Sequence, residues 1–176
     1  MHPQCSVFIA VSLDGFIARP DGRIDYLSIV EQPGEDYGYK RFHDSIDTLI
    51  VGRKTYDLAL GFDPWPYTGK RCIVLTHAPP TAGARHGEEL YSGAPRPLLE
   101  RLATEGSKRC YVDGGAVIQQ FLAAGLITDL TVSVLPILLG EGVPLFGKTG
   151  RDIRLELVEH RAFKSGLVQL EYRLPA

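Results

Sequence analysis

Two adjacent glycines form the strongest candidate for a ligand-binding turn in this chain. Gly114 and Gly115 end an expected strand at 108–115, and an expected helix at 116–125 follows without a linker. The first N–H groups of a helix have no partner within it, and the helix dipole favours an anion there. The two glycines would let a pyrophosphate approach the backbone. The spacing is not the full G-x-G-x-x-G fingerprint, so a tight turn without a ligand is the alternative.

A second segment with phosphate-binding chemistry is Gly52-Arg53-Lys54-Thr55, between an expected strand at 48–52 and a short helix near Thr55. A glycine, two cations and a hydroxyl at such a junction suit a phosphate group. Arg53 fits a ribose 2′-phosphate best, because its planar guanidinium can hold two oxygens at once. The alternative is a solvated helix N-terminus with Thr55 as its cap.

The third candidate segment is Thr76-His77, at the end of an expected strand at 71–76. Thr76 can donate to a phosphate, and His77 can lie against an adenine or its ribose phosphate; a histidine that is merely solvated in a loop is the alternative. Ligands of open α/β sheets lie beyond the carboxyl ends of the strands. Three such strand ends together therefore predict a dinucleotide site.

The order of apolar runs and helical stretches predicts an α/β fold. Expected strands cover 5–12, 48–52, 71–76, 88–92, 108–115, 127–135, 153–163 and 167–174, and expected helices cover 35–45, 97–105 and 116–125, with a short one near Thr55. Proline and glycine make 61–70 a loop, and 136–147 is also expected to be one. We expect one domain, 1–176, in which helices flank a mostly parallel central sheet that ends in an antiparallel C-terminal hairpin.

Composition narrows the class of protein further. The formal net charge is −2 over 176 residues, which does not favour nucleic acid as a partner. No apolar run approaches the roughly 20 residues of a membrane span, and the first residues lack the pattern of a signal peptide. Cys5, Cys72 and Cys110 are odd in number and widely spaced, so we expect neither a disulfide framework nor a metal site, and a cytoplasmic location.

Four segments carry a resemblance to known reductases. VGRKTYD at 51–57 and VDGGAVIQQFL at 112–122 resemble the NADPH-binding motifs of dihydrofolate reductases. FIAVSLDGFIA at 8–18 and PILLGEGVPLF at 136–146 are more similar to the reductase domain of the bifunctional deaminase/reductase of riboflavin biosynthesis. The resemblance runs over nearly the whole chain. It implies a dihydrofolate-reductase-like fold, NADPH as hydride donor and a homodimer.

The resemblance also assigns cofactor contacts by position. Ala10 would face the nicotinamide through its backbone, and Asp14 and Gly15 would shape the loop beside the nicotinamide ribose. The residues implied on the adenosine side are Gly52, Arg53, Thr55, Thr76 and His77, and those at the pyrophosphate are Gly114, Gly115, Ala116 and Val117. Asp113 stands where dihydrofolate reductases commonly have a third glycine, which suits the riboflavin-type branch.

The candidate proton donor and the candidate residues of the substrate pocket are assigned from residue type and from position in the sequence. Asp36, with Glu35 behind it, is the candidate acid, although a solvated carboxylate at a helix start is the alternative. The acidic residue of dihydrofolate reductases has no unambiguous match here, which disfavours folate reduction. Trp65 and Tyr67 could form a wall of the substrate pocket, or could simply pack together. No H-x-E with a later P-C-x-x-C occurs, which excludes zinc-dependent deamination.

The sequence therefore predicts an NADPH-dependent reductase of the riboflavin type, similar to 5-amino-6-(5-phosphoribosylamino)uracil reductases. It would transfer hydride to a C=N or C=O group of a small heterocycle. Two alternatives stay open at this point. One is a dihydrofolate or pterin reductase, and the other is a module that binds NADPH as a sensor without oxidising it.

Overall fold

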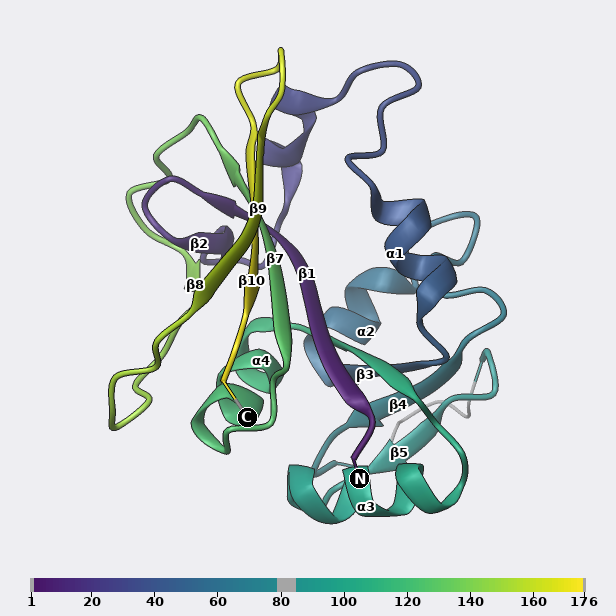
Figure 1. The fold of residues 1–176 in the computed structure, drawn as a ribbon. Coiled ribbons are helices and arrows are strands. Elements are labelled where there is room, and N and C mark those ends of the chain that lie inside the picture. Colours follow the sequence, from purple (N-terminus) through teal and green to yellow (C-terminus); the bar gives the residue numbers. More distant parts are fainter. Residues whose placement is uncertain (1, 79–84, 176) are drawn as a thin grey trace.

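The computed structural model describes residues 2–78 and 85–175, and within them an eight-stranded sheet forms the centre of the molecule (Figure 1). Its strand order is β5-β4-β3-β6-β1-β7-β10-β9. The strands of this sheet are β1 (Gln4–Ser12), β3 (Thr48–Gly52), β4 (Arg71–Leu75), β5 (Glu89–Tyr91), β6 (Arg109–Asp113), β7 (Asp129–Leu135), β9 (Glu156–Ala162) and β10 (Val168–Arg173). All pairs from β5 to β7 are parallel, and β10 joins β7 and β9 antiparallel. The expected α/β architecture is confirmed.

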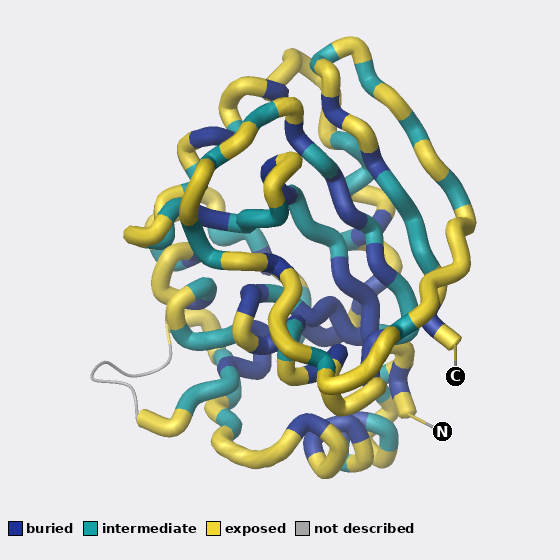
Figure 2. The backbone as a smooth tube through the Cα atoms, turned by 90° about the vertical axis from the view of Figure 1, so that its left-hand side faces the viewer, coloured by how far each residue is buried: buried dark blue, intermediate teal, exposed yellow. Residues whose placement is uncertain are grey.

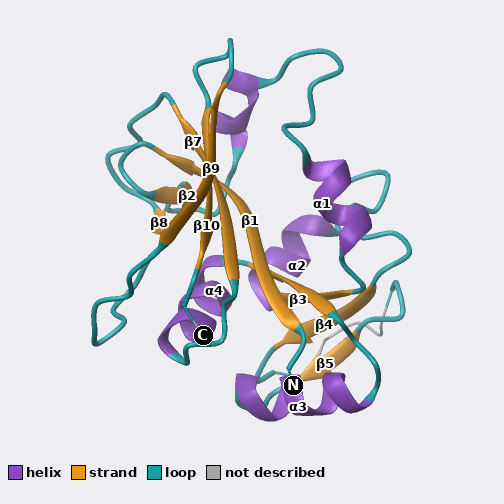
Figure 3. Cartoon of the chain, in the orientation of Figure 1, coloured by secondary structure: helices purple, strands orange, loops and turns teal. Residues whose placement is uncertain are grey.

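Helices cover both faces of the parallel part of the sheet (Figure 3). They are α1 (Tyr39–Ser45), α2 (Arg53–Ala59), α3 (Pro95–Thr104) and α4 (Gly115–Ala123), with a 3₁₀ helix at Asp25–Val30. Side chains alternate between the faces of a strand: on β3, Ile50 packs in one core with α3 and α4, while Leu49 and Val51 pack in a second core with α1 and α2. The central strands are therefore buried and the connecting loops exposed (Figure 2).

Helix α1 starts later than the expected 35–45, at Tyr39. Gly34 and Gly38 have φ angles of +79° and +83°, and Tyr37 also has a positive φ of 53°. Such left-handed residues form turns and cannot lie inside a right-handed helix. The Asp36 carboxylate instead accepts the backbone N–H groups of Gly38 and Lys40, at 2.9 and 3.0 Å, and thereby caps the start of the helix.

Two short strands lie outside the expected elements. Strand β2 (Phe16–Ala18) pairs antiparallel with β8 (Val143–Pro144), inside the segment 136–147 that we expected to be a loop. Patterning cannot indicate strands of two or three residues, because they bury too little to show a period. The pair matters for the site because it packs against the start of α4, where the side chains of Ile17 and Val143 lie beside Gly115.

The register of the sheet brings the three candidate strand ends to one edge. Val51 is paired with Asp113 across β3 and β6, and Gly52 is paired with Leu75 across β3 and β4. Because these strands are parallel, the residues that follow them leave the sheet on the same side. The segments that begin at Gly52, Thr76 and Gly114 are therefore neighbours.

Candidate functional site

Gly114 lies in direct contact with the second candidate segment. Its φ is +94°, and a Cβ there would lie 2.5 Å from Thr55 Oγ1 and 3.6 Å from the backbone nitrogen of Gly52. A Cβ on Gly52 would in turn lie 3.1 Å from Val117 Cγ2. Only glycine fits at 114, both for its backbone conformation and for its space. We call the group formed by Gly52, Thr55, Gly114 and Val117 the glycine cradle.

Helix α4 begins at the glycine cradle with its N-terminus uncapped. Within the part of the chain that the structure describes, no side chain caps this nine-residue helix, and the amide of Ile118 donates to Gly114 O at 2.9 Å. The amides of Gly115, Ala116 and Val117 precede this first helical hydrogen bond. Ala116 is exposed, and Gly115 is buried. Uncapped amides beside Gly52 and Gly114 and the Thr55 hydroxyl fit the pyrophosphate of a dinucleotide.

Arg53 and Lys54 begin helix α2 beside the glycine cradle. Arg53 Nε donates to both carboxylate oxygens of Asp57, at 2.8 and 2.9 Å, and a third of the Arg53 side chain is exposed. Lys54 is exposed. An ion pair this open contributes little to stability, so Arg53 can turn to a phosphate at small cost.

At the third strand end, the Thr76 hydroxyl makes hydrogen bonds within its own loop. Thr76 is half-buried, and its hydroxyl donates to Ala78 O at 3.0 Å and lies 3.2 Å from the Ala78 amide. His77 is exposed. The segment that follows them, 79–84, lies outside the described residues. Thr76 and His77 thus stand at the predicted edge of the sheet, but the Thr76 hydroxyl is engaged locally.

Asp14 links the loop after β1 to the segment 136–147. Its carboxylate accepts hydrogen bonds from the Ser12 hydroxyl at 2.6 Å and from the amides of Leu139 and Gly140 at 3.1 and 2.7 Å. The Ser12 hydroxyl is the main reason that the pKa of Asp14 is lowered. Gly15 follows with a φ of +92°. Asp14 is therefore an ionised carboxylate that positions a loop.

Asp113 connects the glycine cradle with a group of tyrosines. Its carboxylate accepts the Tyr67 hydroxyl at 3.0 Å and the Gly114 amide at 2.8 Å. Burial raises the pKa of Asp113, although both hydrogen bonds oppose the rise. Burial, followed by the charge of Asp113, raises the pKa of Tyr39 to about 12. Asp113 thus links Gly114 to the buried Tyr67.

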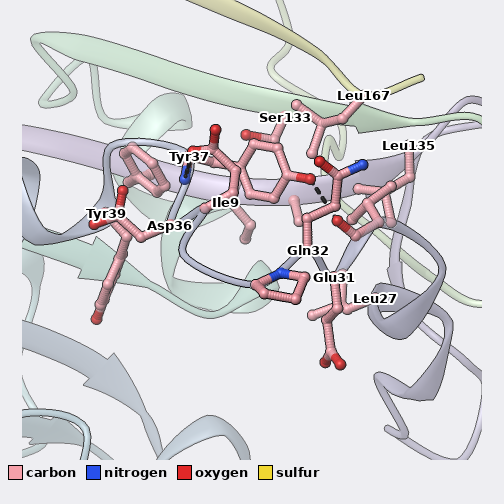
Figure 4. Close-up of a pocket in the computed structure, with 15 residues that line it drawn as sticks. Ile9, Leu27, Glu31, Gln32, Asp36, Tyr37, Tyr39, Ser133, Leu135 and Leu167 are labelled. Carbon is pink, nitrogen blue, oxygen red and sulfur yellow. Dashed lines mark hydrogen bonds between the residues drawn. The ribbon is translucent and has the colours of Figure 1, made fainter. Parts of the chain in front are cut away.

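Tyr39 also lines a pocket of about 740 Å³ between β1, β7 and the segment before α1 (Figure 4). The lining residues are Phe8, Ile9, Ala10, Leu27, Val30, Glu31, Gln32, Pro33, Glu35, Asp36, Tyr37, Tyr39, Ser133, Leu135 and Leu167. Ala10 and Ser133 face each other in the β1–β7 register. The buried Gln169 donates from Nε2 to Ser133 Oγ and to Tyr37 O, at 3.0 Å each. The pocket therefore combines apolar walls with a fixed polar group.

Both candidate acids lie on this pocket, at exposed positions. The two amides that Asp36 accepts in capping α1 lower its pKa. Glu35 Oε1 accepts the amide of Tyr37 at 2.7 Å. A general acid works best with a pKa near the operating pH. The environment of Asp36 moves its pKa the other way. Asp36 accepts two amides and Glu35 accepts one, so Glu35 is the less engaged of the two candidates.

Trp65 and Tyr67 do not line this pocket. Trp65 stacks on His86 with ring centroids 4.1 Å apart, and it contacts Tyr56 and Tyr67 edge to face. Tyr67 is buried and bonded to Asp113. The two aromatic side chains thus belong to the packing beside α2.

Several lining residues were outside the sequence-based assignment. Tyr37 and Tyr39 flank Gly38 just after the two candidate acids, and Ser133 and Leu167 come from β7 and from the turn before β10. Two aromatic residues beside an acidic pair were a usable signal for the first two. Ser133 and Leu167 line the pocket because of the order of the strands in the sheet, and local sequence patterns do not predict that order.

A mostly parallel sheet that places a glycine cradle beside an apolar pocket defines a reductase-like α/β protein of the dihydrofolate-reductase type. The chain belongs to the RibD C-terminal domain family, whose model matches residues 3–169. It is 36% identical over 174 residues to the uncharacterised protein YwjB of Bacillus subtilis (strain 168), with 98% of each chain covered. The uncharacterised protein YyaP of the same organism is 34% identical over 175 residues, with coverage of 93% of this chain and 91% of that one.

Solved structures agree with this assignment. A protein of Shewanella sp. PV-4, assigned provisionally to riboflavin biosynthesis, superposes with a TM-score of 0.90 at 34% identity and full coverage of both chains. The diaminohydroxyphosphoribosylaminopyrimidine deaminase/5-amino-6-(5-phosphoribosylamino)uracil reductase of Thermotoga maritima superposes with a TM-score of 0.74 at 15% identity. That match covers 99% of this chain and 57% of the other, and at such low identity it supports the fold alone.

Proposed function

We propose that the protein is an NADPH-dependent reductase that transfers hydride to a C=N or C=O carbon of a small heterocycle. The observation that carries the proposal is the position of Asp113. It directly precedes Gly114 of the glycine cradle at the end of β6, and β6 pairs with β1, which contributes Phe8, Ile9 and Ala10 to the pocket. A dinucleotide whose pyrophosphate lies at the cradle would therefore end next to the pocket.

The fit of the cofactor rests on the uncapped α4 amides and on the close approach of Thr55 and Gly52 to these amides, which Gly114 allows. Gly114, Gly115, Ala116 and Val117 would hold the pyrophosphate, and Arg53 the ribose 2′-phosphate. Bound nicotinamide supplies the hydride. Ala10 of β1 would orient the nicotinamide ring through its backbone, and Glu35 would pass a proton from solvent to the substrate.

The assignment of Arg53 can be tested by steady-state kinetics with both nicotinamide cofactors. Arg53→Ala should raise the KM for NADPH at least tenfold and leave the KM for NADH nearly unchanged, because one charge-assisted contact to a phosphate contributes roughly 1.5–3 kcal/mol. Arg161→Ala is the matched control, since Arg161 also pairs with a neighbouring carboxylate, Glu159, but lies on the far edge of the sheet. Equal changes for NADPH and NADH would contradict the 2′-phosphate assignment.

A sensor that binds NADPH without oxidising it is the second candidate. It is favoured by the two backbone amides that the Asp36 carboxylate accepts, because they engage one of the two carboxyl groups that could supply a proton. Absorbance of the reduced nicotinamide in the presence of pterins, folates, aminouracils and simple imines separates the two functions. Binding of NADPH without oxidation by any of these compounds would favour the sensor, whereas selective oxidation with folates or pterins would favour a folate-type reductase.

A further inference from the structure

All the charged residues that line the pocket beside the glycine cradle are negative. Three of its fifteen lining residues are carboxylates, namely Glu31, Glu35 and Asp36, and none of the fifteen is Lys, Arg or His. All three carboxylates are exposed and belong to the segment between the 3₁₀ helix and α1; Glu31 and Asp36 are labelled in Figure 4. A ligand that enters the pocket must therefore pass a negatively charged rim.

Cations near this rim are not part of the pocket. Lys40 Nζ pairs with Asp44 at 2.5 Å within α1, and an Arg41 guanidinium nitrogen lies 3.8 Å from a carboxylate oxygen of Glu171 on β10. Lys164 is exposed in the turn between β9 and β10. None of the three lysine or arginine side chains lines the pocket. The described residues thus offer no cation to a phosphate within it.

The start of α1 cannot substitute for a cation. Backbone amides at a helix start can hold a phosphate, but here the Asp36 carboxylate already accepts the amides of Gly38 and Lys40. A phosphate at this point would have to displace a carboxylate that belongs to the chain. A phosphate monoester carries a charge of about −1.5 to −2 near neutral pH, so the rim repels it.

The interior of the pocket favours a flat, apolar ring with a hydrogen-bond acceptor. Phe8, Tyr37 and Tyr39 contribute aromatic surface. The buried Ser133 hydroxyl accepts from Gln169 Nε2, and no acceptor among residues 2–78 and 85–175 takes its proton, so it can donate to a ring nitrogen or carbonyl. Gln169 is itself fixed by its second bond, to Tyr37 O, which gives the donor one orientation.

We propose that the pocket takes a neutral or cationic aromatic heterocycle that carries no phosphate group. The proposal rests on the proposed reductase function and narrows its substrate class. It separates this chain from a reductase of phosphoribosylated pyrimidines, which would need a cationic clamp for the phosphate. The three rim carboxylates are then determinants of specificity: they repel phosphorylated ligands and attract protonated rings.

Two matched pairs of compounds test the proposal by calorimetry on the full chain saturated with NADP⁺. Riboflavin and flavin mononucleotide share a neutral ring, thiamine and thiamine monophosphate share a cationic one, and the members of each pair differ only in the phosphate. With separations of about 8 Å and salt screening, the rim should weaken binding of the phosphorylated member about tenfold. Equal or tighter binding of the phosphorylated members would overturn the proposal, and so would failure of both unphosphorylated compounds to bind.

Charge variants assign the discrimination to the rim. In the double variant Glu31→Gln/Glu35→Gln the preference for the unphosphorylated member should fall to about threefold or less. The control Glu100→Gln/Glu156→Gln removes the same charge from exposed positions on α3 and β9 and should keep the tenfold preference. An unchanged preference in the first variant, or equal loss in both, would contradict the role of the rim.

Binding of NADPH to the chain without substrate is measured separately. If NADPH does not bind, the proposed reductase function fails whatever the compound pairs show. If NADPH binds and the phosphorylated compounds are preferred, only the substrate class proposed here fails.

Discussion

Gly114 is the residue on which the glycine cradle depends. Gly114→Ala would place a Cβ 2.5 Å from Thr55 Oγ1 at a φ of +94°. The backbone conformation, with a ψ of 131°, alone costs a non-glycine residue about 1–3 kcal/mol, and the overlap adds about 1–3 kcal/mol. We expect a loss of about 2–6 kcal/mol in the free energy of unfolding in urea, and at least a tenfold loss of NADPH affinity.

Gly106 provides the matched control for this prediction. Its φ is +90°, but a Cβ there would have no atom within 4 Å. Gly106→Ala should therefore lose only the conformational part, about 1–2 kcal/mol, and bind NADPH as the wild type does. If Gly114→Ala also bound NADPH with unchanged affinity, the pyrophosphate would not lie at this turn.

At the scale of single elements, the end of β6 makes stability depend on pH. Burial raises the pKa of Asp113 in the folded protein, whereas an unfolded aspartate ionises near pH 4. Above about pH 4 the folded state thus holds more protons than the unfolded state, and the free energy of unfolding falls as pH rises, until the pH passes the raised pKa. Asp113→Asn should remove this slope in urea unfolding measured from pH 4 upward.

Tyr67 influences the pH at which this fall in the free energy of unfolding ends. Its hydroxyl donates to Asp113 Oδ2 and favours the ionised carboxylate, so Tyr67→Phe should move the end of the slope to higher pH. The substitution Asp152→Asn makes the same chemical change at an exposed position and should leave the wild-type profile intact. A profile for Asp113→Asn that matches the wild type would show that Asp113 ionises alike in both states.

The bounds of single helices and strands also show which parts of the fold can be predicted from the sequence. Strand β3 has the expected bounds, because four consecutive buried apolar or β-branched residues, followed by Gly52, leave a clear pattern. The start of α1 was missed, because Gly34, Tyr37 and Gly38 set their backbone conformations through local turns that helical periodicity does not register. The two amides that the Asp36 carboxylate accepts were hidden for the same reason, and its role as a proton donor stays a prediction.

At the scale of the whole molecule, the order of the strands in the sheet determines which segments lie side by side, and local sequence patterns do not show this order. Strand ends with glycine and hydroxyl groups could be recognised one by one, and the parallel arrangement made them neighbours. The pocket instead needs Ala10 and Ser133 side by side across β1 and β7, a pairing between segments more than a hundred residues apart in the chain. The homodimer that the resemblance implies stays a prediction.

The cofactor should stabilise the whole molecule, because the glycine cradle joins both cores. Val117 of α4 packs in one core, and Val51 and Tyr56, which flank Gly52-Arg53-Lys54-Thr55, pack in the other. NADPH at 100 times its Kd should add about 2.7 kcal/mol to the free energy of unfolding, which corresponds to roughly 5–10 °C in Tm for a domain of this size. NADH at the same concentration should add less, since Arg53 gains no 2′-phosphate, and Gly114→Ala should respond weakly to both. A wild-type Tm that does not move with NADPH would contradict the cofactor assignment itself, because the linkage depends on binding alone and not on any substrate.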